Sequence, residues 1–411
     1  MSKIIKAQQG VEYRGKSLVV TCLMPLLLLF NNLQLKRVDA YREIIVLISF
    51  LLISVYLQIK RERFGRLFWL AILTLAFATV SATINGSGYG SLVALANLLL
   101  FLSFFSNVRL NVVEKKILLS FLLLSIIVCL LVYSRKAVNT YYYSIFPSIT
   151  KERLNPNTIA IYLFFAYVFA SQLIAFYKDR QTRICLQLFL FAVTLLLVLK
   201  TEARTALLAF LIYVIGLFSR VFANGKKARG IEDASPNKSK HVNRVTFFAI
   251  CLLFTFLFAF VYCALYKIIG GQVKILGKNL FTGRQDVWTD AFDKIKDNLM
   301  WGYSNKYVFN FHGMEYTNAH NSLISVLFMF GIVPACLTVA LMVWAFSNVV
   351  RERFNRFVII AIYCCLIIMT FETLLTDANL YLYFGFLFLL GGEASDTQKD
   401  TLLLVRGKAV K

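Results

Sequence analysis

Long apolar blocks alternate with short polar segments along the chain. The blocks are rich in Leu, Phe and Ile, and most are long enough, at 1.5 Å per residue, to cross about 30 Å of hydrocarbon as a helix. The pattern predicts an all-α polytopic membrane protein with about twelve transmembrane helices. The predicted helices cover residues 17–32, 43–59, 67–84, 91–106, 116–133, 156–177, 184–200, 204–222, 245–267, 320–346, 356–375 and 378–392.

Lys and Arg residues gather in every second polar segment. If the N-terminus is cytoplasmic, most of the 44 Lys and Arg residues fall on the cytoplasmic side. The outer turn 85–90 then has no charge, whereas the inner segment 60–63 reads Lys-Arg-Glu-Arg. Because cytoplasmic loops collect Lys and Arg, we predict a protein of the cytoplasmic membrane with both termini in the cytoplasm. The inner segments are 1–16, 60–66, 107–116, 178–183, 220–244, 351–356 and 393–411.

The net charge of +23 does not indicate a nucleic-acid partner here. The chain is 59% hydrophobic and only 16% charged, and the sidedness of Lys and Arg accounts for the charge, so the lipid bilayer is the expected partner. The 8 cysteines lie in apolar blocks without a CxxC pair, and there are only 3 histidines. We therefore expect no metal site and no other cofactor. His241, in a polar inner loop, is expected to be inert.

Three regions follow from this topology. Residues 1–155 hold the first five transmembrane helices, residues 156–392 form the remaining transmembrane core, and residues 393–411 are a cytoplasmic tail. The core includes a large extracytoplasmic loop, 268–319. The inner loop 223–244 is polar and basic, which favours contact with anionic lipid headgroups.

Two predicted helices begin with candidate binding residues on the outer side. Asn157 follows a proline at the first position of helix 156–177, so it is either part of a good helix start or a ligand contact. Thr201 can cap the next outer helix start and place Arg204 in its first turn. Arg204 then either reaches lipid headgroups or faces an anion, and Glu202 is a candidate ion-pair partner.

The large outer loop is predicted to contain an amphipathic helix. Thr282 and Gln285 have the spacing of a capping box, with Arg284 in the first turn. The dipole and backbone N–H groups at a helix start favour an anion such as phosphate. The alternative is a helix that only packs as a lid. The predicted apolar face consists of Val287, Trp288, Ala291, Phe292 and Ile295.

A histidine opens the longest predicted outer-to-inner helix. If Asn318 caps helix 320–346, His320 lies in its first turn, where the helix dipole disfavours imidazolium. A neutral imidazole can act as a base or as a hydrogen-bond partner. Glu372 and Asp377, which flank the last outer turn, are alternative carboxylate bases. The role of His312 stays open.

These residues together resemble the O-antigen polymerase and O-antigen ligase superfamily of bacterial membrane glycosyltransferases, over residues 155–345. The histidine pattern is carried by His320 and Asn321, with Gly331 after nine further residues; Pro334 departs from the family's last position. The other matching features are Asn155-Pro156-Asn157, Arg204 before an apolar helix, Arg284 in the outer loop and Gly302 after Trp301.

The resemblance implies a GT-C-like fold and a lipid substrate, an undecaprenyl-diphosphate-linked oligosaccharide at the outer leaflet, with a chain-length regulator as a further partner. It implies that Arg204 and Arg284 bind the diphosphate through bidentate contacts and stabilise its developing charge. His320 then orients or deprotonates the acceptor hydroxyl. The expected substrate-binding residues are Asn157, Asn321, Glu202 and Tyr142; an interfacial aromatic belt also explains Tyr142.

Three functions are compatible with these residues. A polymerase would join repeat units into a capsular, exopolysaccharide or O-antigen chain, and within the superfamily we favour this function. A ligase would move a finished glycan to another acceptor. A flippase for lipid-linked oligosaccharides would be expected to carry cations inside the bundle and to lack a fifty-residue outer loop, opposite to the distribution in this chain.

Overall fold

The computed structural model describes most of the predicted core and part of the N-terminal region. The predicted helix 17–32, almost all of 43–59, Tyr142, Asp377 and His312 lie outside the described residues. The described residues are 49, 52, 65–86, 89–106, 108–133, 156–221, 231–233, 238–269, 274–275, 278–279, 283–304, 307–311, 314–316, 319–351, 353–375 and 380–393.

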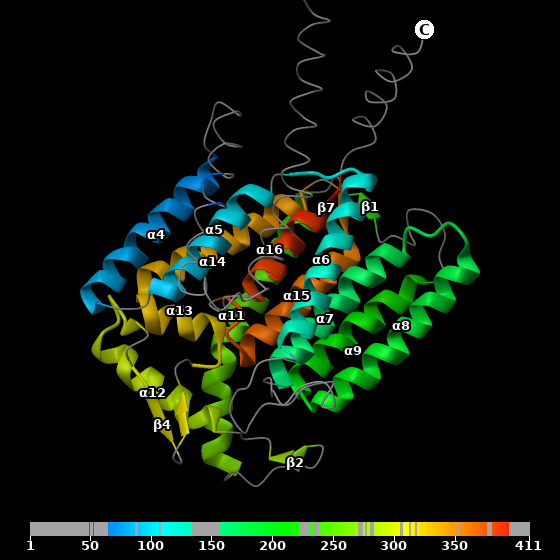
Figure 1. Cartoon of the computed structure of the whole chain (residues 1–411). Helices are drawn as coiled ribbons and strands as arrows, with labels where there is room; N and C mark the ends of the chain where they lie inside the picture. Colours follow the sequence, from blue (N-terminus) through cyan, green and yellow to red (C-terminus); the bar gives the residue numbers. More distant parts are fainter. Residues whose placement is uncertain are drawn as a thin grey trace, which may run out of the picture.

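The described chain is a bundle of helices (Figure 1). Its helices are α4 (Arg66–Asn85), α5 (Tyr89–Phe105), α6 (Val112–Tyr133), α7 (Pro156–Ile174), α8 (Arg180–Thr201), α9 (Arg204–Val221), α11 (Lys238–Ile269), α12 (Arg284–Asp297), α13 (Ser322–Phe330), α14 (Ile332–Val349), α15 (Arg356–Phe371) and α16 (Leu380–Gly391). Each predicted helix from 67–84 onward has a counterpart, except 320–346, and the bounds agree within a few residues apart from the start of 245–267, which lies inside α11.

Several of the described helices have the length and composition of membrane spans. Five of them, α4, α7, α8, α11 and α14, are long and apolar enough to cross a bilayer. Four others, α5, α9, α15 and α16, are apolar but shorter. This mostly helical, apolar structure fits an all-α integral membrane protein, and the count of twelve spans stays a prediction.

The predicted helix 320–346 is wrong as a single helix, because it is broken at Gly331. Gly331 has φ +85°, a conformation that favours glycine. A Cβ atom there would collide with the carbonyl oxygen of Met300, which enters the break from the outer loop. The N–H of Ile332 donates to the carbonyl of Leu299 at 2.9 Å. Pro334 falls in the first turn of α14, where its missing N–H costs no helical hydrogen bond.

Helix α7 lies at the centre of the bundle, with 67% of its span buried. Five of its buried side chains are aromatic and pack on aromatic side chains of α9 and α16, as in the tilted rings of Phe165 and Tyr383, whose centroids are 5.6 Å apart. Side chains also join α7 to α15. Asn355, the N-cap of α15, donates from Nδ2 to Gln172 Oε1 at 2.7 Å. The start of α15 is thereby held against the end of α7.

One end of the bundle collects segments that were predicted to be cytoplasmic. A small antiparallel sheet in the order β1-β6-β7 joins β1 (Ile231–Asp233), β6 (Arg353–Asn355) and β7 (Gly392–Glu393), at the top of Figure 1. Arg109 donates to the carbonyl of Asn348 at 2.7 Å, and Lys115 donates to that of Gly392 at 2.9 Å. Basic side chains thus satisfy carbonyls at helix C-terminal ends.

His241 also lies near this end, but not in a loop as predicted. It belongs to the first turn of α11, and its Nε2 is 3.2 Å from Ser347 Oγ on α14. The predicted loop 223–244 therefore ends earlier, because α11 begins at Lys238, among the polar residues that precede the apolar block. The side chain of His241 contributes to packing between two helices.

The opposite end carries α12 and two hairpins, β2 (Lys274–Ile275) with β3 (Lys278–Asn279) and β4 (Phe309–Phe311) with β5 (Met314–Tyr316) (Figure 1). The predicted amphipathic helix is confirmed, because Val287, Trp288, Ala291 and Ile295 are buried. The ring of Phe292 stacks on that of Phe260 of α11, with 3.9 Å between centroids. The predicted capping box is wrong, because Gly283 is the N-cap and no side chain caps the helix.

Candidate active site

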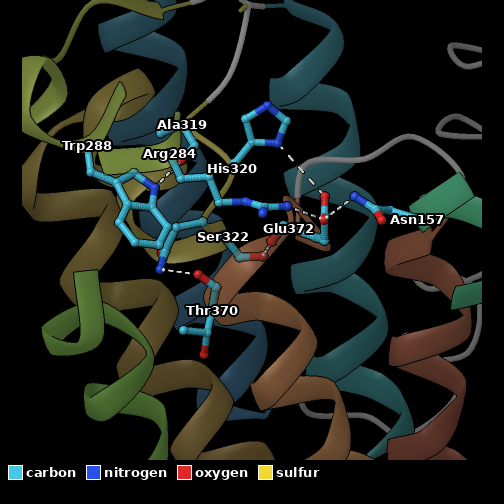
Figure 2. Close-up of polar contacts among 9 residues, drawn as sticks. Asn157, Arg284, Trp288, Ala319, His320, Ser322, Thr370 and Glu372 are labelled. Atoms are coloured by element: carbon cyan, nitrogen blue, oxygen red, sulfur yellow. Dashed lines mark hydrogen bonds and ion pairs between the residues drawn. The ribbon is translucent and has the colours of Figure 1, made fainter. Parts of the chain in front are cut away.

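The carboxylate of Glu372 is the centre of a group of polar contacts at the α12 end of the bundle (Figure 2). Arg284 Nη2 lies 2.9 Å from Glu372 Oε1. Asn157 Nδ2 donates to the same oxygen at 2.9 Å. His320 Nδ1 lies 3.9 Å from the other oxygen, Oε2. The structure therefore brings together three of the predicted site residues around a fourth, and we call these four residues the Glu372 cluster.

The Glu372 cluster is largely buried but retains some exposure. The exposed fractions of the side chains are 12% for Glu372, 18% for Arg284 and 25% for His320. Burial alone would raise the pKa of Glu372, but the neighbouring imidazole of His320 and the positive charge of Arg284 together outweigh it. The pKa of Glu372 is lowered, so its side chain is ionised at neutral pH.

The start of α12 positions Arg284. It is the first helical residue after Gly283, which has φ +83°. No side chain caps this end, so the first backbone N–H groups add to the positive potential around the guanidinium. The guanidinium also lies over the ring of Phe371, 5.8 Å from its centroid. These features place a cation, the positive end of a helix dipole and a buried carboxylate side by side.

His320 was predicted to lie in the first turn of a helix, but it lies just before the start of α13. Asn321, rather than Asn318, is the N-cap of α13. His320 has φ +47°, a left-handed conformation that is uncommon for a residue with a side chain. The dipole argument for this histidine required a first-turn position and no longer applies. Non-glycine residues in this region cluster at functional sites, which agrees with a site role for His320.

Asn321 is fully buried, and its side chain is directed at the backbone. Its Oδ1 accepts from the N–H groups of Leu323 and Ile324, and its Nδ2 donates to the carbonyls of Thr255 at 2.8 Å and Thr370 at 3.0 Å. The side chain thus joins α11, α13 and α15. We therefore revise its predicted substrate contact to a structural role that holds His320 next to the end of α15.

Arg204 and Glu202 lie outside the contacts that define the Glu372 cluster. Arg204 is the half-buried first residue of α9, and α9 packs on α7 and α15. Glu202 is exposed and adopts φ 55° as the C-cap of α8, while Thr201 Oγ1 accepts from the N–H of Ala203 at 3.3 Å. The roles of Arg204 and Glu202 stay predictions, as does that of Tyr142.

Glu372 was named from the sequence only as an alternative base, and its central position was missed. The predicted helix 356–375 placed it inside a helix, whereas α15 ends at Phe371. One signal was available: a carboxylate at the end of an apolar helix is costly unless it is paired. Ser322, whose Oγ donates to the backbone carbonyl of Glu372 at 2.7 Å, was also missed.

The Glu372 cluster combines a cation that can bind an anion with an imidazole and a carboxylate that can accept or orient a proton. In the part of the chain that the structure describes, no three His, Cys, Asp or Glu side chains gather as a metal ion would require. The chemistry available from these residues is anion binding and acid–base catalysis.

Comparison with known families identifies a segment that carries two of the four residues of the Glu372 cluster. Residues 189–339 match the family model described as O-antigen ligase. This match places the segment in the O-antigen polymerase and ligase superfamily. The match covers Arg204, Arg284 and His320, so the resemblance drawn from the sequence is confirmed, while Asn157 and Glu372 lie outside it. A search of curated proteins finds no match to the chain.

Proposed function

We propose that this superfamily member is a polysaccharide polymerase of the cytoplasmic membrane. It joins undecaprenyl-diphosphate-linked oligosaccharide repeat units at the outer face, in the synthesis of a capsule, an exopolysaccharide or an O-antigen. The observation that carries the proposal is the Glu372 cluster, which groups an arginine, a histidine and a carboxylate at the end of the bundle that holds α12.

The diphosphate of the donor binds at Arg284. A guanidinium has five N–H donors in a rigid fork, so Arg284 can contact Glu372 and a phosphate oxygen together. The start of α12 adds its dipole to this site. Arg204 is the second proposed cation, because α9 packs on α7, which bears Asn157, and on α15, which ends directly before Glu372. Negative charge that develops on the leaving diphosphate is stabilised by these cations.

The acceptor hydroxyl is activated by His320. The hydroxyl oxygen forms a bond to the anomeric carbon of the donor sugar, and the bond from that carbon to the diphosphate oxygen breaks. The hydroxyl proton passes to the imidazole. Glu372, 3.9 Å from Nδ1, orients the imidazole and stabilises the positive charge that forms on it. Asn157 holds Glu372 in place through its 2.9 Å hydrogen bond.

A ligase that transfers a finished glycan to another acceptor would use the same chemistry, since only the acceptor differs. A flippase is less well supported, because the described interior around α7 is packed with aromatic side chains. Deleting the gene separates the three functions. Single repeat units on the carrier outside the cell indicate a polymerase, full-length polymer left on the carrier indicates a ligase, and accumulation at the inner leaflet indicates a flippase.

A direct test uses the purified protein in lipid nanodiscs with a synthetic undecaprenyl-diphosphate repeat unit. We expect carrier-linked products of two or more repeats, resolved by mass spectrometry. Arg284→Ala is expected to abolish their formation. Lys296→Ala, which changes a largely exposed cation on the same helix, is the matched control and should retain activity. Wild-type turnover by Arg284→Ala would refute the proposed site.

A further inference from the structure

The indole of Trp288 contacts residues adjacent to members of the Glu372 cluster. Trp288 lies one helical turn after Arg284 on α12 and is fully buried. Its Nε1 donates to the carbonyl of Ala319, the residue before His320 (Figure 2). Its ring centre is 6.4 Å from that of Phe371, the residue before Glu372. The side chain of Trp288 therefore connects the segments that carry Arg284, His320 and Glu372.

The hydrogen bond to Ala319 is the specific part of this connection. The ring of Tyr262, 5.1 Å away, packs edge-on against the indole and closes it off from the α11 side. In such surroundings the indole N–H requires an acceptor, and the carbonyl of Ala319 provides it. That carbonyl precedes a residue with φ +47°, so the hydrogen bond fixes the backbone where His320 takes its unusual conformation.

A second joint holds the far end of α12. Gly302, with φ +66°, and Gly331 bring the loop after α12 into the break between α13 and α14. The N–H of Tyr303 donates to the carbonyl of Phe328 at 2.7 Å. A Cβ atom on Gly302 would collide with that same carbonyl oxygen. Helices α12 and α13 are therefore fastened near both ends, and we call this pair the α12–α13 brace.

We infer that Trp288 is a positioning residue for the reaction, which acts through Arg284, His320 and Glu372 by holding α12, the start of α13 and the end of α15 in one register. The Gly302–Gly331 joint supplies the second fixed point of the α12–α13 brace. The effect of Trp288 on turnover rests on the proposed function, whereas its effect on the geometry of the site does not. Displacing reacting groups by about 1 Å can lower turnover roughly a hundredfold.

Trp288→Phe tests this inference, because phenylalanine keeps a buried aromatic ring but has no N–H donor. Trp344→Phe on α14, where the side chain is 37% exposed, is the matched control. The first measurement needs no substrate: the full-length protein in nanodiscs is treated with diethylpyrocarbonate, and modification of His320 and His241 is followed by peptide mass spectrometry. The second is turnover of the lipid-linked repeat unit, and the third is the thermal unfolding midpoint.

We expect Trp288→Phe to change the modification rate of His320 at least about twofold and to lower kcat roughly tenfold or more, with a smaller change in KM. His241, on the far side of the bundle, should react at the wild-type rate, and the unfolding midpoint should stay within a few degrees. A purely structural role would lower the midpoint without changing the relative reactivity of the two histidines. Trp344→Phe should match the wild type in all three measurements.

Unchanged reactivity of His320 in Trp288→Phe would overturn the inference, whatever the turnover. Altered reactivity together with a wild-type protein that makes no oligomer would support the α12–α13 brace and refute the proposed function. If Trp288→Phe does not fold, Gly302→Ala tests the other joint. The inference then requires that Gly302→Ala, in which Trp288 is intact, changes the modification rate of His320. A wild-type modification rate would overturn the inference.

Discussion

Replacing Glu372 with glutamine tests the centre of the site. Glu372→Gln keeps the size and one carbonyl oxygen of the side chain, so Asn157 can still donate to it. It removes the negative charge that lies 2.9 Å from Arg284 and 3.9 Å from His320. The variant therefore separates the charge of Glu372 from its shape.

The expected cost to stability is moderate. Removing one partner of a fully buried ion pair costs about 3–5 kcal/mol, and an exposed pair is worth about 0–1 kcal/mol. With exposed fractions of 12% and 18% for its two side chains, the Arg284–Glu372 pair should cost about 1–3 kcal/mol when broken. Loss of the group that orients the catalytic base should lower turnover by about 10²–10⁴-fold.

The stability difference should also depend on pH in a defined direction. The pKa of Glu372 is lower in the folded protein than its ordinary value. Its charge therefore stabilises the fold fully above the ordinary pKa of glutamate, and the contribution is lost as pH falls through the lowered pKa. The wild type should be more stable than Glu372→Gln at neutral pH, and the two should converge in acid.

Thermal unfolding in nanodiscs across this pH range and turnover at pH 7 measure both effects. Asp293→Asn is the matched control, because it makes the same change in an exposed ion pair on α12 and should change neither measurement. If Glu372→Gln keeps wild-type turnover and wild-type stability at pH 7, the carboxylate is not the centre of the site.

Three further substitutions test individual side chains. Arg284→Lys keeps the charge but not the fork, and turnover should fall at least about tenfold in the oligomer assay if the contact with phosphate is bidentate. Arg204→Lys should be impaired to a similar degree if Arg204 binds the diphosphate; wild-type activity would indicate a headgroup contact instead. Asn321→Ala removes a helix cap and two buried donors, and should lower the free energy of unfolding by about 2–4 kcal/mol in thermal denaturation. An unfolding midpoint equal to the wild type would contradict the structural role of Asn321.

The helices were predictable because a bilayer imposes a simple pattern on the sequence. A helix in hydrocarbon must be apolar over its whole length, so α7 and α9 begin at the residues predicted from the sequence. The break at Gly331 was not predictable in this way. It depends on the carbonyl of Met300, which arrives from a different part of the chain, and the apolar pattern continues across it without interruption.

The site was predictable only as far as each residue stood near a helix start. Arg284 and His320 were found by that reasoning, and both belong to the Glu372 cluster. The central position of Glu372 depends on the meeting of α7, α12, α13 and α15, which no local pattern encodes. Asn321 was expected to bind substrate because of the family resemblance, whereas its hydrogen bonds are all directed at the backbone.

If the proposed function holds, the length of α15 sets how far the reaction lies from open water. α15 has 16 residues, so it rises about 24 Å along its axis, and any tilt reduces its depth across the membrane. In the proposed orientation it starts beside Arg353 and Arg356 at the cytoplasmic boundary, and Glu372 then lies several ångströms short of the outer edge of a hydrocarbon layer about 30 Å thick. An activated sugar held at that depth competes with few water molecules, so transfer to a sugar hydroxyl is favoured over wasteful hydrolysis of the donor.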